Sequence, residues 1–236
     1  MPIFDPARRR LVTRVVYDGP ALAGKTTNVQ SICASMPVER RTEVYTPGAL
    51  RGRTMFFDWL EIEIGRAGNV PVACQVLSVP GQRARSYRRR PLVKSADALV
   101  FVADSRHSTM DENKRCLALM RRYLRERNDW VPIVVQANKQ DVAGALTPAE
   151  VGAALRIPRL SPVIGGSASK GVGVRECFNT AIKAALRAMQ DRIADEGLAS
   201  ISGSVSTADD LLDTLLVLEE QEDFGEEEPT DAELAS

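Results

Sequence analysis

The stretch GPALAGKT, residues 19–26, has the spacing G-x-x-x-x-G-K-[ST] of a phosphate-binding loop. In such a loop the glycines let backbone N–H groups turn inward around phosphate oxygens. The lysine reaches the β- and γ-phosphates, and the threonine hydroxyl binds Mg²⁺ at a helix N-terminus. An ordinary glycine-rich turn is the alternative, but here an apolar strand precedes the loop and a helical stretch follows it. The residues assigned to the nucleotide are Gly19, Ala21, Leu22, Ala23, Gly24, Lys25, Thr26 and Thr27, with Thr26 also assigned to the metal.

Apolar segments bounded by turn residues alternate with helical stretches along the chain. The segments with the composition of strands are 11–18, 55–64, 72–79, 98–104, 131–138 and 160–165. The second and third are separated only by GRAGNVP, which indicates a hairpin. This order predicts an α/β fold: a mostly parallel six-stranded sheet with one antiparallel strand, helices on both faces, and ligands at the carboxyl ends of the strands.

The 236 residues suit one domain with an extension, and we expect the domain at 1–195, a flexible linker at 196–206 and an acidic tail at 207–236. The charge is uneven: residues 1–190 hold 30 of the 31 Lys and Arg and 16 of the 31 Asp and Glu, a net of +14, and the remainder has a net of −14. Five tail leucines recur at helical spacing, at positions 211, 212, 215, 216 and 218. One hypothesis is that this leucine face docks on the body or a partner while the tail carboxylates meet the basic switch segment that follows Gln82; a solvated terminus is the alternative.

A second motif, NKQD, follows a buried strand and places Asn138, Lys139 and Asp141 at its end. A carboxylate at Asp141 accepts from the N1–H and 2-amino groups of guanine, two donors that adenine does not offer in that arrangement. Asn138 can bond guanine O6 or N7, and the Lys139 stem can pack along the base. In the loop GGSASKG, the backbone of Ser167 and Ala168 is placed to donate to O6. Alone each pattern is a common polar loop, but after a phosphate loop they favour guanine.

Two further segments can reach the γ-phosphate. In TPGALRGRTMFFDWL, Thr54 can deliver a second hydroxyl to Mg²⁺ and Arg53 can reach the phosphate; an exposed loop is the alternative. In LSVPGQ, the N–H of Gly81 can sense the γ-phosphate and Gln82 can orient the attacking water, or the pair can form a simple Pro-Gly turn with an exposed glutamine.

Over about residues 8–190 the chain resembles MglA-like bacterial small GTPases of the Ras superfamily, which act as switches in gliding motility and cell polarity. The segments VVYDGPALAGKTTN, RTMFFDWL, VPGQ, ALVFVADS and NKQD occur in the family's order. The resemblance implies a small-GTPase fold, bound GTP or GDP with Mg²⁺, and a Roadblock-type partner that accelerates hydrolysis, besides effector proteins. It also implies that Arg53 acts as an intrinsic arginine finger, that Gln82 positions water, and that the second and third predicted strands rearrange between nucleotide states.

Three features depart from the wider family. Most Ras-like proteins carry an Asp four residues before the switch glutamine, and it bonds a water on Mg²⁺. This chain has Ser78 at that position, and MglA-like proteins also have a hydroxyl residue there, so we expect Mg²⁺ to be held less tightly. The segment after Gln82 is unusually basic, so partner identity can differ. The acidic tail has no counterpart in the resemblance.

The sequence therefore predicts a cytoplasmic GTPase with slow intrinsic hydrolysis, stimulated by a partner and recruited to cell poles only through partners. The main alternative is a GTP-binding scaffold without significant hydrolysis. Direct nucleic-acid binding is disfavoured because few aromatic residues accompany the arginines. No direct membrane anchor is expected, since no segment is long and apolar enough to cross a bilayer and no lipidation box is present in ELAS, residues 233–236.

Overall fold

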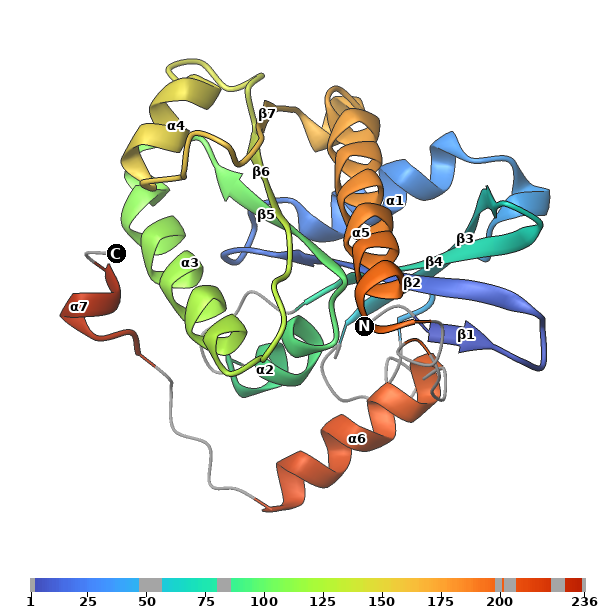
Figure 1. Cartoon of the computed structure of the whole chain (residues 1–236). Helices are drawn as coiled ribbons and strands as arrows, with labels where there is room; N and C mark the ends of the chain where they lie inside the picture. Colours follow the sequence, from blue (N-terminus) through green and yellow to red (C-terminus); the bar gives the residue numbers. More distant parts are fainter. Residues whose placement is uncertain are drawn as a thin grey trace.

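A seven-stranded sheet forms the centre of the protein (Figure 1). The computed structural model describes residues 3–46, 57–79, 86–197, 201, 207–221 and 228–234. The strands are β1 (Ile3–Asp5), β2 (Arg10–Asp18), β3 (Asp58–Ala67), β4 (Val70–Ser78), β5 (Ala98–Asp104), β6 (Ile133–Asn138) and β7 (Val163–Gly165). The helices are α1 (Lys25–Ser35), α2 (Ser86–Lys94), α3 (Met110–Arg125), α4 (Pro148–Ala154), α5 (Val174–Glu196), α6 (Ala208–Gln221) and α7 (Asp231–Leu234). Short 3-10 turns are η1 (Val38–Arg40), η4 (His107–Thr109) and η5 (Ala168–Lys170).

The strand order is β3-β4-β2-β5-β6-β7, and β1 pairs antiparallel with the start of β2. The β2–β4, β2–β5, β5–β6 and β6–β7 pairs are parallel, whereas β3 and β4 form the predicted antiparallel hairpin. The predicted fold class is therefore confirmed. The additional strand, β1, has three residues, which is too short for a periodic pattern to be visible in the sequence.

Helix α2 was not expected from the sequence, because its nine residues combine four basic side chains with Pro91. An interior proline removes a helical hydrogen bond and costs about 3 kcal/mol in an isolated helix. Here tertiary packing compensates, since Leu92, Val93 and the guanidinium-bearing Arg89 are all buried against the body.

Each face of the sheet carries its own apolar core. On one face, Val15 and Tyr17 of β2 pack with residues of α1 and α5. On the other, Val16 of β2 packs with residues of α2, α3 and α6. Strands buried on both faces are apolar at nearly every position, which explains the continuous hydrophobic runs in the sequence.

The C-terminal segment contains two helices that lie against the body. Thr207 and Asp210 cap α6 reciprocally, with the Thr207 N–H donating to the Asp210 carboxylate at 2.7 Å and the Asp210 N–H to the Thr207 hydroxyl at 3.2 Å. Short helix α7 lies beside α3 (Figure 1). Among the helices in the described part of the chain, none is long and apolar enough to cross a membrane.

Candidate functional site

The loop between β2 and α1 adopts a conformation that only glycine accommodates at two positions. Gly19 has φ 141° and Gly24 has φ 103°. A Cβ on Gly19 would lie 2.3 Å from the Val102 carbonyl oxygen, and one on Gly24 would lie 2.4 Å from Nδ2 of Asn138. Both glycines are therefore required by close approach as well as by φ. The other assigned loop positions are Ala21 and Leu22, which are exposed, Ala23, which is buried, and Thr27, which is half-buried.

Lys25 at the start of α1 points back over its own loop. Its Nζ donates to the carbonyl oxygens of Gly19 at 2.9 Å and Pro20 at 2.7 Å, and the residue is 7% exposed. Burial lowers the pKa of Lys25 to about 8, although the nearby Asp18 carboxylate opposes that shift. A phosphate group beside this ammonium would favour its charged form, so the position suits an anion.

A buried carboxylate that the sequence did not single out lies beside Thr26. The Thr26 hydroxyl donates to Oδ2 of Asp58 at 2.6 Å, and the Ser78 hydroxyl donates to the same oxygen. Thr46 donates to Oδ1 at 3.1 Å. The sequence signal for Asp58 was the predicted hairpin, in whose register Asp58 pairs directly with Ser78. Most Ras-like proteins carry an aspartate at the position of Ser78, whereas in this chain the aspartate lies on the neighbouring strand.

Asn138 at the end of β6 connects the two loops assigned to the nucleotide. Its Nδ2 donates to the Ala23 carbonyl oxygen at 2.7 Å, and its Oδ1 accepts from the Ala168 N–H at 2.9 Å. Both ends of the amide and the Ala168 N–H are thus engaged within the protein. The direct contacts of Asn138 and Ala168 with guanine O6 or N7 stay predictions; what the structure places on Asn138 is the connection between the phosphate loop and the 167–170 turn.

The remaining residues of the NKQD motif lie at the same edge of the sheet. Lys139 adopts φ 67°, and its Nζ lies 2.7 Å from Oδ2 of Asp104, the last residue of β5. Burial would raise the pKa of Asp104, but hydrogen bonds from Arg106 and Lys139 hold it below its ordinary value. Asp141 is exposed, and a hydrogen bond with the Ser167 side chain lowers its pKa. Asp141 is therefore an ionised acceptor at neutral pH, open to a ligand.

Four assigned residues fall outside the described part of the chain: Arg53, Thr54, Gly81 and Gln82. Their roles in hydrolysis and metal binding stay predictions.

A buried ion pair links α2 to the base of the phosphate loop. Arg89 is 1% exposed and Asp18, the residue before Gly19, is 0% exposed. The Nη2 of Arg89 lies 2.8 Å from Oδ1 of Asp18 and 2.9 Å from Oδ2, and the Gly19 N–H also donates to Asp18 at 2.7 Å. Burial alone would lower the pKa of Arg89, but the Asp18 carboxylate raises it above its ordinary value. Arg89, which belongs to the basic segment after Gln82, thus pairs with Asp18, the residue immediately before the phosphate loop.

Comparison with known proteins identifies this arrangement. The family model described as the ADP-ribosylation factor family matches residues 11–190. The chain belongs to the ADP-ribosylation factor family. It is 32% identical over 189 residues to the mutual gliding-motility protein MglA of Myxococcus xanthus, covering 79% of this chain and 96% of that protein.

Two eukaryotic members of the family match shorter regions. ADP-ribosylation factor-like protein 4D of Mus musculus is 36% identical over 132 residues, which is 52% of this chain and 63% of the relative. ADP-ribosylation factor-like protein 2 of Arabidopsis thaliana is 34% identical over 111 residues, which is 44% of this chain and 58% of the relative. The predicted resemblance to MglA-like small GTPases is confirmed, and the chain is a small GTPase of the GTP-binding switch class.

The ion pair between Arg89 of α2 and Asp18 at the base of the phosphate loop should stabilise the folded protein. Replacing Arg89 by Met leaves the Asp18 carboxylate buried without its partner, which should lower the free energy of unfolding by about 3–5 kcal/mol. Urea denaturation followed by circular dichroism, at one fixed GDP concentration, measures the change.

Arg90→Met is the matched control, because the Arg90 side chain is 48% exposed and pairs with Glu126 at the surface. That substitution should change stability by less than about 1 kcal/mol. An Arg89→Met protein as stable as the Arg90→Met protein would show that the buried pair is not stabilising.

Proposed function

We propose that the protein binds GDP and GTP with Mg²⁺ at the carboxyl edge of the sheet, hydrolyses GTP slowly, and signals its nucleotide state to partner proteins. The observation that carries this proposal is the Asn138 side chain, which hydrogen bonds to Ala23 of the phosphate loop and Ala168 of the base loop. This contact joins residues that are 115 positions apart along the chain, which supports a single nucleotide site built from both sequence motifs.

In this proposal the phosphate loop from Gly19 to Thr27 wraps the phosphates, with Lys25 at the β- and γ-phosphates. Asp141 accepts from the N1–H and 2-amino groups of guanine, and the loop at Ser167 and Ala168 closes over the base. The exposed, ionised state of Asp141 supports this role, because a carboxylate is an acceptor at both oxygens.

The residues around Thr26 suit Mg²⁺ rather than a metal held by protein ligands alone. Within the described ranges no group of three or more His, Cys, Asp or Glu side chains has the geometry of a metal site. Mg²⁺ in nucleotide sites needs only one or two protein ligands, because phosphates and waters complete its octahedron. Thr26 and Thr54 would hold the ion, which neutralises developing charge on the phosphates when it is bound.

Hydrolysis would depend on two residues brought to the γ-phosphate: Gln82 orients the attacking water and Arg53 stabilises the charge that develops on the transferred group. Phosphoryl transfer needs little covalent chemistry from the protein, so positioning and electrostatics supply most of the rate. A partner that orders these two residues would accelerate turnover.

The biological setting is proposed from the relative whose name describes gliding motility. We propose a role in cell polarity or motility, a Roadblock-type activating partner, and recruitment of this cytoplasmic protein to the poles through effectors. Capture of partners by the GTP-bound protein, compared with the GDP-bound protein, tests this setting.

The base assignment predicts a reversal of specificity. In an Asp141→Asn protein an amide N–H replaces a carboxylate oxygen, so the N1–H and 2-amino groups of guanine no longer both find an acceptor. Xanthine has a carbonyl in place of the 2-amino group, and this carbonyl can accept from the new amide N–H. We expect the affinity for GDP to fall at least about tenfold, since hydrogen bonds to charged groups contribute about 1.5–3 kcal/mol each. Titration with fluorescent GDP, XDP and ADP measures this, and unchanged GDP affinity would contradict the assignment.

The catalytic assignment predicts that Gln82→Leu slows single-turnover GTP hydrolysis strongly while leaving GTP affinity nearly unchanged. Arg53→Ala should slow it too, by as much as about 10³- to 10⁵-fold if Arg53 acts as an arginine finger. Gln30→Leu is the control, because Gln30 is exposed on α1. Equal rates for wild type and Gln82→Leu would instead support a GTP-binding scaffold without significant hydrolysis.

A further inference from the structure

Three hydroxyl groups from three parts of the chain converge on the carboxylate of Asp58. Thr26 comes from α1, Thr46 from the segment that follows η1, and Ser78 from the end of β4. Asp58 itself is 4% exposed and starts β3. Because β3 runs antiparallel to β4, its first residue lies at the same edge of the sheet as the ends of the parallel strands.

The hydrogen bond from Thr26 has a definite direction. The Asp58 carboxylate accepts hydrogen bonds, so the Thr26 hydroxyl donates its single proton to Oδ2 at 2.6 Å. Its lone pairs then point away from the carboxylate. A hydroxyl held in this way is oriented to coordinate a cation, as second-shell acceptors orient metal ligands elsewhere.

The Asp58 carboxylate interacts electrostatically with the Lys25 ammonium, but that ammonium donates its hydrogen bonds to the carbonyl oxygens of Gly19 and Pro20 and not to the carboxylate. No Lys or Arg of the described ranges forms an ion pair with it, whereas the equally buried Asp18 is paired with Arg89. A buried carboxylate needs a compensating charge, and hydroxyl donors supply only partial dipoles. A divalent cation next to Thr26 would supply that charge.

We propose that Asp58 is the carboxylate of the magnesium site, held in the outer coordination shell behind Thr26. It compensates for the serine at position 78, where most Ras-like proteins carry an aspartate. This inference rests on the proposed nucleotide site and adds to it a residue from the neighbouring strand.

The test measures release of fluorescent GDP from the full-length protein, first with Mg²⁺ and then with EDTA. In wild type, Mg²⁺ should slow release. Asp58→Asn keeps the shape of the side chain and removes the charge, so it should reduce this Mg²⁺ effect by about 10- to 100-fold, the usual cost of losing an outer-shell ligand. The release rate in EDTA should stay near that of wild type.

Two further variants sharpen the result. Glu63→Gln removes an exposed carboxylate from the same strand and should leave the Mg²⁺ effect unchanged. In the Asp58→Asn background, Ser78→Asp returns a carboxylate across the same strand pair and should restore most of the effect. An Asp58→Asn protein with a full Mg²⁺ effect would overturn the proposal; a wild type that binds no GDP would overturn the proposed function itself.

A separate observation concerns α6. Its residues Leu211, Leu212 and Leu215 belong to the same buried apolar cluster as Trp59 of β3 and Leu77 of β4. At the start of the helix, Asp209 accepts from the Tyr45 hydroxyl at 3.3 Å. The helix therefore covers a face of the sheet that would otherwise expose a tryptophan and several aliphatic side chains.

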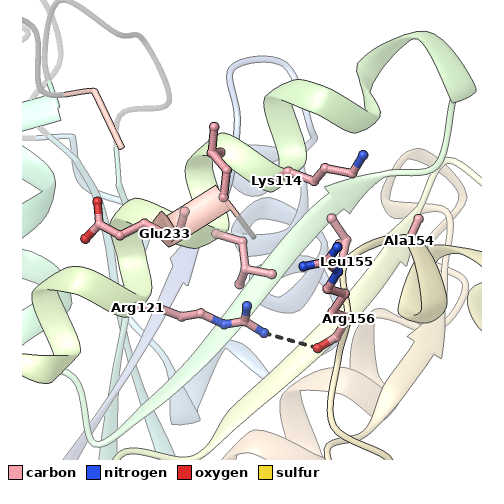
Figure 2. A pocket seen from close by; sticks show the side chains of 9 residues that line it. Lys114, Arg121, Ala154, Leu155, Arg156 and Glu233 are labelled. Carbon is pink, nitrogen blue, oxygen red and sulfur yellow. Dashed lines mark hydrogen bonds between the residues drawn. The ribbon is translucent and has the colours of Figure 1, made fainter. Parts of the chain in front are cut away.

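The rest of the described tail reaches α3. Glu228 lies 2.6 Å from Nε of Arg115, and Glu233 lies 2.7 Å from Nη2 of Arg125. Leu234 helps line a small cleft between α3 and α4, where Figure 2 shows Glu233 across from Ala154 and Arg156. These carboxylates meet arginines of α3, so the expectation that they meet the basic switch segment is wrong for Glu228 and Glu233.

The elements under α6 are those that border the predicted switch segments. β3 begins at Asp58, four residues after Thr54; β4 ends at Ser78, four residues before Gln82; and α2 follows at Ser86. The buried cluster that contains the α6 leucines also contains Leu92 and Val93 of α2. A protein that contacts this face beside the switch segments would have to displace α6.

We propose that α6 and α7 form a displaceable intramolecular ligand for a docking surface made by β3, β4, α2 and α3. The surface takes an acidic amphipathic helix with leucines on one face, and in the isolated protein the chain's own tail occupies it. Partners carrying such a helix would compete with the tail.

Trp59 reports on the contact. It is 6% exposed, and it lines a cleft together with Thr207 and Ala208 at the start of α6, whereas the second tryptophan, Trp130, is 78% exposed. In a full-length Trp130→Phe background, acrylamide quenching measures Trp59 alone. Leu211→Asp with Leu215→Asp should raise quenching severalfold, because a charged face cannot stay in the apolar cluster.

Val217→Asp is the control, since Val217 is 50% exposed on the same helix and should leave quenching unchanged. Stoichiometric binding of fluorescent GDP shows that each variant is folded. A peptide of residues 207–234, added to the double-aspartate protein, should restore Trp59 protection. Unchanged quenching in the double variant, or a peptide that restores nothing, would overturn the proposal.

Discussion

Polar side chains buried at the carboxyl edge of the sheet must each find a partner, and the site depends on how those partners are supplied. β2 ends at Asp18, β4 at Ser78, β5 at Asp104 and β6 at Asn138, all of them buried. An unpaired polar group there would cost several times what a surface hydrogen bond contributes. Each is satisfied by a group from another element, so the helices and loops around this edge are fixed in relation to one another.

The same pairings divide the edge into parts that are closed and parts that are open to a ligand. Asp18 accepts hydrogen bonds from Arg89 and the Gly19 N–H, and Asn138 bonds to Ala23 and Ala168. Among the described residues, Lys25 in contrast donates only to carbonyl oxygens of its own loop, which carry no full charge. Exchange of those carbonyls for phosphate oxygens strengthens its hydrogen bonds, because an ionised acceptor binds more strongly than a neutral one.

Sequence reasoning found the parts of this site whose chemistry is local. The phosphate loop and NKQD each place several functional residues within eight positions, at spacings that a strand-to-loop transition requires. The role of Asp58 was missed, and Arg89 was counted only as part of the basic segment after Gln82, because their partners are distant: 32 residues separate Thr26 from Asp58, and 71 separate Asp18 from Arg89. Asp58 lies in RTMFFDWL and Arg89 in the basic run after Gln82, but neither pattern says what the side chain contacts; the strand register and the packing of α2 reveal that.

The tail shows how far charge composition can mislead about energetics. A basic body and an acidic tail suggest docking by ion pairs, yet each pair has one exposed partner: Glu228 is 50% exposed against Arg115 at 8%, and Arg125 is 54% exposed against Glu233 at 13%. Solvent therefore screens both pairs, and we expect each to contribute nearer the ~0–1 kcal/mol of a surface pair than the energy of a buried one. Three leucines of α6 are each at most 8% exposed, and burying one contributes about 1.5–3 kcal/mol. The apolar face therefore dominates the attachment, and the carboxylates mainly select where on α3 the last turn lies.

This balance connects the tail with the nucleotide site. The leucines of α6 share a buried cluster with side chains of β3, β4 and α2, and Asp58 and Ser78 lie on the opposite face of the same hairpin, toward Thr26. A shift of the hairpin by one residue would turn every side chain to the other face, which would remove Asp58 from Thr26 and Trp59 from α6 together. The register of one pair of strands thus sets both the charge beside the phosphate loop and the surface that the tail covers.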